Sequence, residues 1–306
     1  MGLQNTKDML KKASLEGYAI GAFNFTNMEQ LQAILETANE LNSPVIVAVS
    51  SSALNYITPE ILMGMINGAT KDIKIPVALH LDHGKNFEIC KQAIDMGFPS
   101  IMIDASYLTF EENVKLTKQI VDYAKKFNVS VEAELGKLAG VEDEVVGANS
   151  NYTSPKEAKL FVELTGVDSL AISIGTSHGA YKFEGKPILQ LDLLKQIKKA
   201  IPNTPLVLHG ASSVSNELIE SFNKSGGDLK GAKGVSTDLL KKAIRSGIAK
   251  VNVDSDLRIA FTTGVRESLK NEELFDLRTY LTEGKKKIKE QVTYKTINIF
   301  KSANKG

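Results

Sequence analysis

Eight short runs rich in β-branched residues alternate with longer amphipathic stretches along this chain. Because most of the runs are almost continuously apolar, they are typical of parallel strands buried on both faces. The stretches between them have helical spacing, and no Pro/Gly/Ser-rich linker divides the chain. The pattern predicts an α/β fold, a (β/α)8 TIM barrel rather than an open doubly wound sheet, in one domain over residues 1–306. The predicted strands are residues 19–24, 45–50, 76–82, 100–104, 129–135, 168–174, 205–209 and 249–254.

The composition restricts the class of protein further. With 42% hydrophobic and 24% charged residues, the chain can bury a large core as a globular protein. A net charge of +1 argues against nucleic acid as a partner, and no stretch reaches the length of a membrane span or resembles a secretory signal. The single cysteine, Cys90, excludes a disulfide within the chain and is expected to be buried in a helix. These features predict a cytoplasmic location.

Three segments do not fit a minimal barrel. Residues 136–153 follow the fifth predicted strand and are Gly-rich, so we expect a mobile lid there. Residues 224–235 are a second Gly-rich loop, either close to a bound phosphate or a surface connection. Residues 271–306 extend past the eighth unit as one or two helices that pack against the barrel or a partner subunit, which favours a homodimer or homotetramer.

Three histidines, each followed by glycine, stand at or near the ends of predicted strands. His83, His178 and His209 would surround one point at the mouth of a barrel, where loops after the strands meet. Three neutral imidazoles with one open position are a catalytic zinc arrangement. His80 lies three residues inside its strand and is expected to be a core group or to support a ligand. The sequence therefore predicts a metal site.

Carboxylates stand at the same end of the barrel. Asp82 precedes His83 and suits proton transfer to a substrate hydroxyl, with the orientation of an imidazole as its alternative role. Asp104 and Glu134 end the fourth and fifth strands and could hold a second cation or tune the first. Glu142 and its neighbour Asp143 lie in the 136–153 segment, where closure over a metal would make one of them a base.

The loops after the last three strands have the composition of a phosphate cradle. Such loops, together with a helix N-terminus, bind phosphate in this architecture. The residues concerned are Gly179, Lys182, Gly210, Ser212, Asn252, Asp254 and Ser255.

Seven motifs, in order and spacing, resemble the class II (zinc-dependent) fructose-bisphosphate aldolases over residues 1 to about 300. They are GAFNF, LHLDHG, IMIDAS, VEAELG, GTSHGAYKF, LVLHGASS and KVNVDSDLR, and the GGDLKGAKGV insertion is similar to the type B subgroup. The resemblance implies reversible cleavage of fructose 1,6-bisphosphate to dihydroxyacetone phosphate and glyceraldehyde 3-phosphate. It also implies that His83, His178 and His209 hold Zn²⁺, with Glu134 and Asp104 near an alternative position of that metal or near a second divalent ion.

The resemblance assigns roles to further residues. Asp82 would handle the proton of the C4 hydroxyl, and Glu142 would exchange the proton at the enediolate carbon. Ser50 and Arg258 would contact the distal phosphate, and Lys182 would serve a monovalent cation (Na⁺ or K⁺) or a phosphate. The ketone-phosphate half would be lined by Asn24, Gly179, Gly210, Ser212, Asn252, Asp254 and Ser255.

Other functions predict different residues or products. A Schiff-base aldolase needs a lysine at a strand's carboxyl end, whereas Lys250 opens the eighth predicted strand and is expected on the wrong face. A non-catalytic metal-binding subunit and a metallohydrolase of phosphorylated sugars stay as alternatives. Tagatose 1,6-bisphosphate is the alternative substrate. Because Asp254 could hydrogen-bond one C4 epimer better than the other, we expect a preference for fructose.

Overall fold

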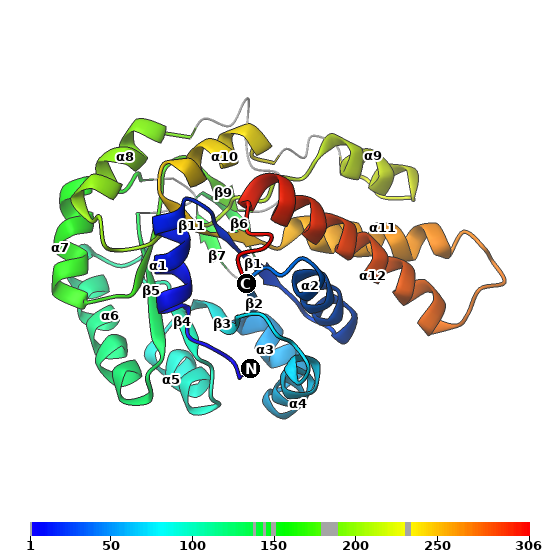
Figure 1. Ribbon diagram of the computed structural model, residues 1–306, viewed down its shortest axis with the longest axis horizontal. Coiled ribbons are helices and arrows are strands. Elements are labelled where there is room, and N and C mark those ends of the chain that lie inside the picture. Colours follow the sequence, from blue (N-terminus) through cyan, green and yellow to red (C-terminus); the bar gives the residue numbers. More distant parts are fainter. Residues whose placement is uncertain (1, 137–138, 143–144, 148–150, 179–188, 230–233) are drawn as a thin grey trace.

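Eight parallel strands form a closed barrel, as the sequence predicts (Figure 1). The computed structural model describes residues 2–136, 139–142, 145–147, 151–178, 189–229 and 234–306, with only the backbone for 139–142, 145–147 and 178. Around the barrel the order is β1-β11-β10-β8-β5-β4-β3-β2, and β1 closes against both neighbours. The strands are β1 (Ile20–Asn24), β2 (Val45–Ser50), β3 (Val77–Gly84), β4 (Ser100–Ile103), β5 (Ser130–Leu135), β8 (Ser169–Ile172), β10 (Leu206–Leu208) and β11 (Ile248–Val253).

Helices connect the strands and cover the outside of the barrel (Figure 1). Side-chain caps begin most of them. Thr109 and Glu112, for example, form a reciprocal capping box at the start of α6. The connecting helices are α2 (Met28–Glu40), α3 (Ser51–Ile57), α4 (Pro59–Thr70), α5 (Phe87–Asp95), α6 (Phe110–Ala124) with the 3-10 turn η1 (Lys125–Phe127), α7 (Pro155–Thr165), α8 (Leu191–Ala200), α9 (Asn216–Lys224) and α10 (Thr237–Arg245).

The N-terminal helix α1 (Thr6–Glu16) closes the barrel end opposite the site. Its Met9 and Leu10 join an apolar cluster with Ile20 of β1 and Ala78 of β3. The Thr6 hydroxyl lies 2.8 Å from the Ser130 hydroxyl at the start of β5. Because this end is filled by side chains, a ligand has access to the interior only from the carboxyl ends of the strands.

The C-terminal segment supplies two more helices and completes the outer layer. Helices α11 (Ser255–Ser268) and α12 (Leu277–Tyr294) form a hairpin that projects beyond the barrel at the right of Figure 1. The π-helix η2 (Lys295–Phe300) then returns to β1, where the Phe300 carbonyl accepts a hydrogen bond from the Ala19 amide at 3.0 Å. Residues 271–306 are therefore largely helical, as the sequence predicts.

The first of the two long loops contains two short strands among its described residues. Within residues 136–153, β6 (Ala139–Glu142) and β7 (Val145–Gly147) pair as an antiparallel hairpin. Strand β6 also pairs with β9 (Ser177–His178), which forms a second sheet of order β7-β6-β9. The 224–235 segment lies between α9 and α10, and its Val235 amide donates to the Ser212 carbonyl at 3.0 Å. The described residues next to α10 thus contact the loop that follows β10.

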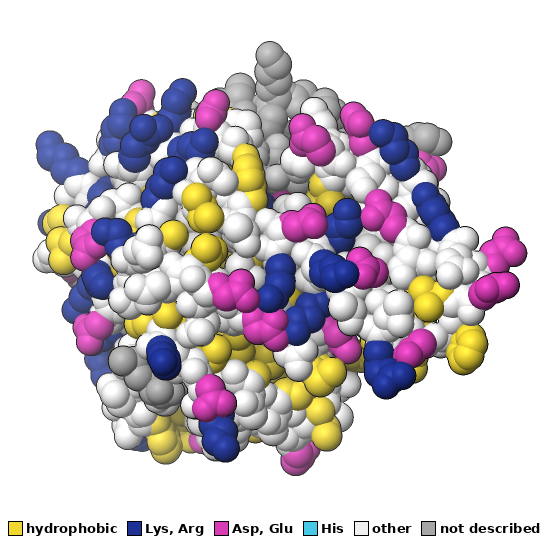
Figure 2. Space-filling view, turned by 45° about the vertical axis from the view of Figure 1, so that its right-hand side comes forward, with side chains coloured by type: hydrophobic (Ala, Val, Ile, Leu, Met, Phe, Trp, Pro, Cys, Tyr) yellow, Lys and Arg dark blue, Asp and Glu magenta, His cyan; other side chains and the backbone are white. Residues whose placement is uncertain are grey.

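The remaining features of the surface and core agree with the composition. Lys and Arg side chains are interspersed with Asp and Glu over most of the face in Figure 2, without a continuous basic stripe on that face. None of the helices in the described ranges is long and apolar enough to cross a bilayer. Cys90 is buried in α5, and burial, together with the charge of Glu88, raises the pKa of its thiol to about 12. The thiol is therefore unreactive, as expected of a core cysteine.

Candidate active site

The end of β3 places two consecutive side chains, Asp82 and His83, at the barrel mouth. Alternation along a strand would send neighbouring side chains to opposite faces. His83, however, has a φ of 49°, and the register with β4 shifts between Leu81 and Gly84. This local turn brings both side chains inward. A positive φ at a non-glycine residue is a strained conformation of the kind that occurs at functional sites.

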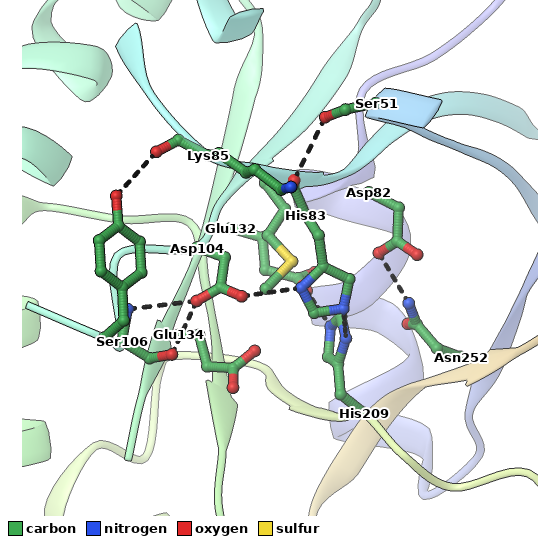
Figure 3. Close-up of polar contacts among 12 residues, drawn as sticks. Ser51, Asp82, His83, Lys85, Asp104, Ser106, Glu132, Glu134, His209 and Asn252 are labelled. Atoms are coloured by element: carbon green, nitrogen blue, oxygen red, sulfur yellow. Dashed lines mark hydrogen bonds and ion pairs between the residues drawn. The ribbon is translucent and has the colours of Figure 1, made fainter. Parts of the chain in front are cut away.

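The imidazoles of His83 and His209 face each other across the mouth (Figure 3). His83 Nε2 lies 3.0 Å from His209 Nδ1, and the rings meet edge to face. The other nitrogen of each ring points at a carboxylate. His83 Nδ1 lies 3.0 Å from Asp104 Oδ2, and His209 Nε2 lies 2.8 Å from Glu132 Oε1. Because carboxylates only accept, these outer nitrogens carry the N–H groups.

This arrangement fits a metal ion. With the outer nitrogens protonated, two neutral imidazoles would direct lone pairs at each other, which is unfavourable unless a metal ion or an added proton lies between them. Asp82 adds a carboxylate, and one donor atom from each of Asp82, His83 and His209 lies within 4.8 Å of the others. Burial lowers the pKa of His83, but the charges of Asp82 and Asp104 outweigh it, so the pKa is well above its usual value. The same negative field attracts a divalent cation, and nitrogen and carboxylate donors suit zinc.

His178, the third predicted ligand, lies outside the barrel sheet. Strand β8 ends at Ile172, and the backbone of His178 belongs to β9, paired with Gly140 of β6. Its side chain is outside the described residues, as is that of Glu142. The backbone of Glu142 is in β6, the neighbour of β9. The two predicted residues therefore come from adjacent strands of one small sheet.

A second carboxylate group adjoins the first. Donor atoms of His83, Asp104 and Glu134 lie within 4.8 Å of one another. Asp104 also accepts from the Ser106 amide and hydroxyl at 3.2 and 2.8 Å, and although burial opposes it, hydrogen bonds from His83 and Ser106 lower its pKa. Burial and then the charge of Asp104 raise the pKa of Glu134, whose Oε2 has no hydrogen-bond partner among the described residues. Asp104 thus orients the His83 ring, and Glu134 is the freer of the two to bind a cation.

The Asp82 carboxylate is held by two amides (Figure 3 shows one of them). Asn24 donates to Oδ2 and Asn252 donates to Oδ1, both at 2.9 Å. Burial raises the pKa of Asp82, but the nearby charges of His83 and His209 outweigh it and lower the pKa overall. Asn24 and Asn252, predicted as substrate contacts, therefore also fix this carboxylate. Their own buried Oδ1 atoms have no hydrogen-bond partner among the described residues, so each keeps an acceptor for a ligand.

A buried network beneath the metal site was not predicted from the sequence. The Lys250 ammonium donates to both oxygens of Glu132 at 3.0 and 2.9 Å and lies 3.2 Å from His80 Nε2. His80 Nδ1 lies 2.8 Å from the Ser100 hydroxyl, and both Lys250 and His80 are fully buried. Lys250 lies in the first half of β11 as expected, but the expected face was wrong, because its side chain points into the barrel. The alternation of Glu132 and Glu134 in VEAEL is the signal that places both carboxylates inside.

The loops after β10 and β11 carry the predicted phosphate residues that are described. Gly210 has a φ of 58°, and a Cβ there would lie 2.7 Å from the Ser177 backbone, so glycine is required. Ser212 is buried beside it, and Ser255 begins α11. Asp254 Oδ1 accepts from Arg258 Nε at 2.8 Å.

Of the remaining predicted substrate contacts, one is described, and it ends β2 opposite Asp82. Ser50 caps α3 through the Ala53 amide, and Gly179 and Lys182 fall outside the described residues.

Comparison with known proteins agrees with this geometry. Residues 4–305 match the family model described as "Fructose-bisphosphate aldolase class-II". The chain is 49% identical to the fructose-bisphosphate aldolase of Thermus caldophilus over 288 residues, which is 93% of this chain and 94% of the relative. It is 45% identical to that of Treponema pallidum, covering 100% of this chain and 98% of the relative.

Solved structures have the same fold over nearly the whole chain. The YdjI aldolase of Escherichia coli K12 superposes with a TM-score of 0.81 at 32% identity, covering 99% of both chains. A crystal structure of a putative fructose-1,6-bisphosphate aldolase from Coccidioides immitis gives 0.82 at 29% identity, covering 97% of this chain and 96% of that one. The matched family model spans almost every residue that builds the barrel and its site. The chain belongs to the class II fructose-bisphosphate aldolase family.

Proposed function

We propose that this protein catalyses the reversible, metal-dependent cleavage of fructose 1,6-bisphosphate into dihydroxyacetone phosphate and glyceraldehyde 3-phosphate. The observation that carries the proposal is the opposed pair of imidazoles, His83 and His209, beside the Asp82 carboxylate. The family supplies the reaction class. His83 and His209 supply donor atoms for one divalent ion, and Asp82 is a charged base close to the same ion position.

The residues of the chain have distinct tasks in this reaction. A divalent metal held by His83, His209 and His178 would stabilise the negative charge that develops on the ketone half as the carbon–carbon bond breaks. Asp82, kept ionised and oriented by Asn24 and Asn252, accepts the proton of the C4 hydroxyl during cleavage and returns it during condensation.

Two further tasks fall to residues around the metal. Glu142 exchanges the proton at the reacting carbon of the ketone half, a role that the family resemblance supports. Asp104 and Glu132 fix the ligand rings by accepting from their outer nitrogens.

Several finer features belong to the same proposal. The metal is zinc, Glu134 and Asp104 adjoin a position for a second divalent ion, and a monovalent cation (Na⁺ or K⁺) binds near Lys182. The 224–235 segment supports membership of the type B subgroup.

The enzyme is cytoplasmic, forms one barrel domain with residues 271–306 as an extension, and assembles as a homodimer or homotetramer. The projecting α11–α12 hairpin, with Phe275 at its tip 91% exposed, supports the assembly.

The phosphate contacts are proposed on the loops after the last barrel strands. Ser212 and Ser255 stand beside Gly210 and the start of α11, where amides at a helix N-terminus favour an anion. Arg258 and Ser50 are proposed for the distal phosphate. Arg258 is half exposed and its Nε donates to the buried Asp254, so its outer nitrogens can contact a phosphate while the ion pair stays intact.

A chelation experiment separates this reaction from its alternatives. Removal of metal with a chelator should abolish the cleavage of fructose 1,6-bisphosphate, and zinc should restore it. Borohydride in the presence of substrate should trap nothing, because the amine of Lys250 is already bound by Glu132 and lies close to His80. Cleavage that survives chelation and is trapped by borohydride would contradict the proposal. Released inorganic phosphate would indicate a hydrolase, and the absence of turnover a non-catalytic subunit.

A further inference from the structure

Lys295 is a buried lysine that the proposed reaction does not use. It begins the π-helix η2 and is 2% exposed. Its ammonium donates to Asp256 Oδ1 at 2.7 Å and to the Ser213 hydroxyl at 2.6 Å. Asp256 is itself fully buried, and its Oδ2 has no hydrogen-bond partner among the described residues. Lys295 therefore accounts for every described hydrogen bond of this carboxylate.

The two partners of Lys295 belong to the two segments of the proposed phosphate cradle. Ser213 follows Ser212 in the loop after β10, and Asp256 follows Ser255 in the first turn of α11. These segments are more than 40 residues apart in the chain. The ammonium of Lys295, from the C-terminal segment, thus hydrogen-bonds to both segments.

The residues just before α10 also contact the loop after β10. The Val235 amide donates to the Ser212 carbonyl, and a Cβ added at Gly234 would lie 2.4 Å from the Val214 nitrogen. The loop is therefore held both by a close backbone neighbour and by a charged hydrogen bond. A segment held in this way has little freedom to adjust when an anion binds.

We propose that Lys295 is a positioning residue that sets the spacing of the two phosphate-binding segments. It contacts no reacting atom. Phosphate binding at a helix N-terminus requires several N–H and O–H groups to point at one place, and a shift of about 1 Å far from the chemistry can cost about 100-fold in rate. This inference rests on the proposed placement of the phosphate at Ser212 and Ser255, and the experiment below tests that placement separately.

The expected effect is on phosphate affinity and not on the metal. Lys295→Met should raise the KM for fructose 1,6-bisphosphate and the inhibition constant of inorganic phosphate about ten- to a hundred-fold. Zinc affinity should stay unchanged, because neither Lys295 nor its described partners contact His83 or His209. Combining Lys295→Met with Asp256→Asn removes the uncompensated buried charge. This double variant should recover thermal stability while phosphate affinity stays low.

A control lysine lies in α12, the helix that directly precedes η2. Lys285 of α12 pairs with Glu36 of α2 at 2.6 Å, away from the cradle. Lys285→Met should lower thermal stability slightly without changing the inhibition constant of phosphate. If Lys285→Met and Lys295→Met weaken phosphate binding equally, Lys295 acts only by stabilising the C-terminal helices in general, and the proposal is overturned.

Two further variants keep the experiment decisive. Should Lys295→Met fail to fold, Ser213→Ala removes one of its two contacts and leaves the ion pair intact. Ser213→Ala should also weaken phosphate binding with zinc affinity unchanged, and a wild-type inhibition constant would refute the proposal.

Ser212→Ala tests whether phosphate binds at this loop at all. If Ser212→Ala leaves phosphate affinity unchanged, the placement of the phosphate is wrong; if only that variant loses affinity, the role of Lys295 is wrong.

Discussion

The ion pair of Lys250 and Glu132 should control zinc affinity without contacting the metal. Glu132 accepts from His209 Nε2 at 2.8 Å and from the Lys250 ammonium through both oxygens. It thereby keeps His209 Nδ1 unprotonated and directed at His83 Nε2. The change to make is Glu132→Gln, alone and together with Lys250→Met.

The magnitude follows from the burial and charge of the pair. Glu132→Gln replaces a charged acceptor for His209 by a neutral one, a loss of about 1–1.5 kcal/mol. That corresponds to about tenfold in zinc affinity, at the lower end of the roughly 10–100-fold range for residues that orient metal ligands. The single change also leaves the Lys250 ammonium unpaired where it is fully buried, at a cost of about 3–5 kcal/mol of folding free energy. The double variant replaces both charges and should recover most of that stability.

The assay measures the two properties separately. Zinc affinity is obtained by competition with a chromogenic chelator, and the free energy of unfolding by urea titration of the metal-free protein, since bound metal would itself stabilise the fold. Stability should return in the double variant while zinc affinity stays about tenfold reduced. If zinc affinity returned with stability, Glu132 would not orient His209. Lys295→Met with Asp256→Asn, which changes another buried lysine–carboxylate pair, is the control and should keep wild-type zinc affinity.

Two further changes test the proposed chemistry. Asp82→Ala should reduce kcat about 10²–10⁴-fold with zinc retained, because it removes the proton acceptor; loss of zinc with an unchanged rate per bound metal would make Asp82 a ligand instead. We expect the wild-type protein to prefer fructose over tagatose 1,6-bisphosphate by about ten- to a hundred-fold, because Asp254 makes a hydrogen bond worth roughly 1–3 kcal/mol to one C4 epimer only. Asp254→Ala removes that hydrogen bond and should reduce the preference. The ratio of kcat/KM for the two purified sugars decides it, and equal values for the wild-type protein would contradict the assignment. Because Asp254 also pairs with Arg258, the KM of the variant reports separately on the distal phosphate.

The fold was predictable because barrel strands have a simple signature. Each of the eight predicted runs overlaps a barrel strand, since strands buried on both faces need continuous apolar sequence and their connections are short. The strands of the second sheet were not predicted. Strand β6 lies in a Gly-rich segment and β9 has only two residues, so neither has a periodic pattern. Their pairing depends on contacts between distant parts of the chain.

The candidate site was predictable where residue type and strand position suffice. Asp82, His83 and His209 converge as expected, because parallel strands end at a common rim. The inward turn of His83 depends on its positive φ, which local sequence does not specify. Glu132 and Lys250 were missed as a pair because β5 and β11 are far apart in the chain and become opposed only when the barrel closes.

Segment 209–213 joins the metal half of the site to the phosphate half. At one end Glu132 holds His209 from the barrel interior, and at the other Lys295 holds Ser213 from the C-terminal segment. Between them Gly210 makes a turn that other residues would not fit. Because both ends are fixed by buried charged groups, the spacing between the metal donor and the phosphate loop is set before substrate binds. The ketone and the phosphate of the substrate are joined by a few bonds, so the metal and the phosphate loop must lie at a matching distance. Apolar side chains in place of the two buried ion pairs could keep the protein stable, but they would not fix that distance.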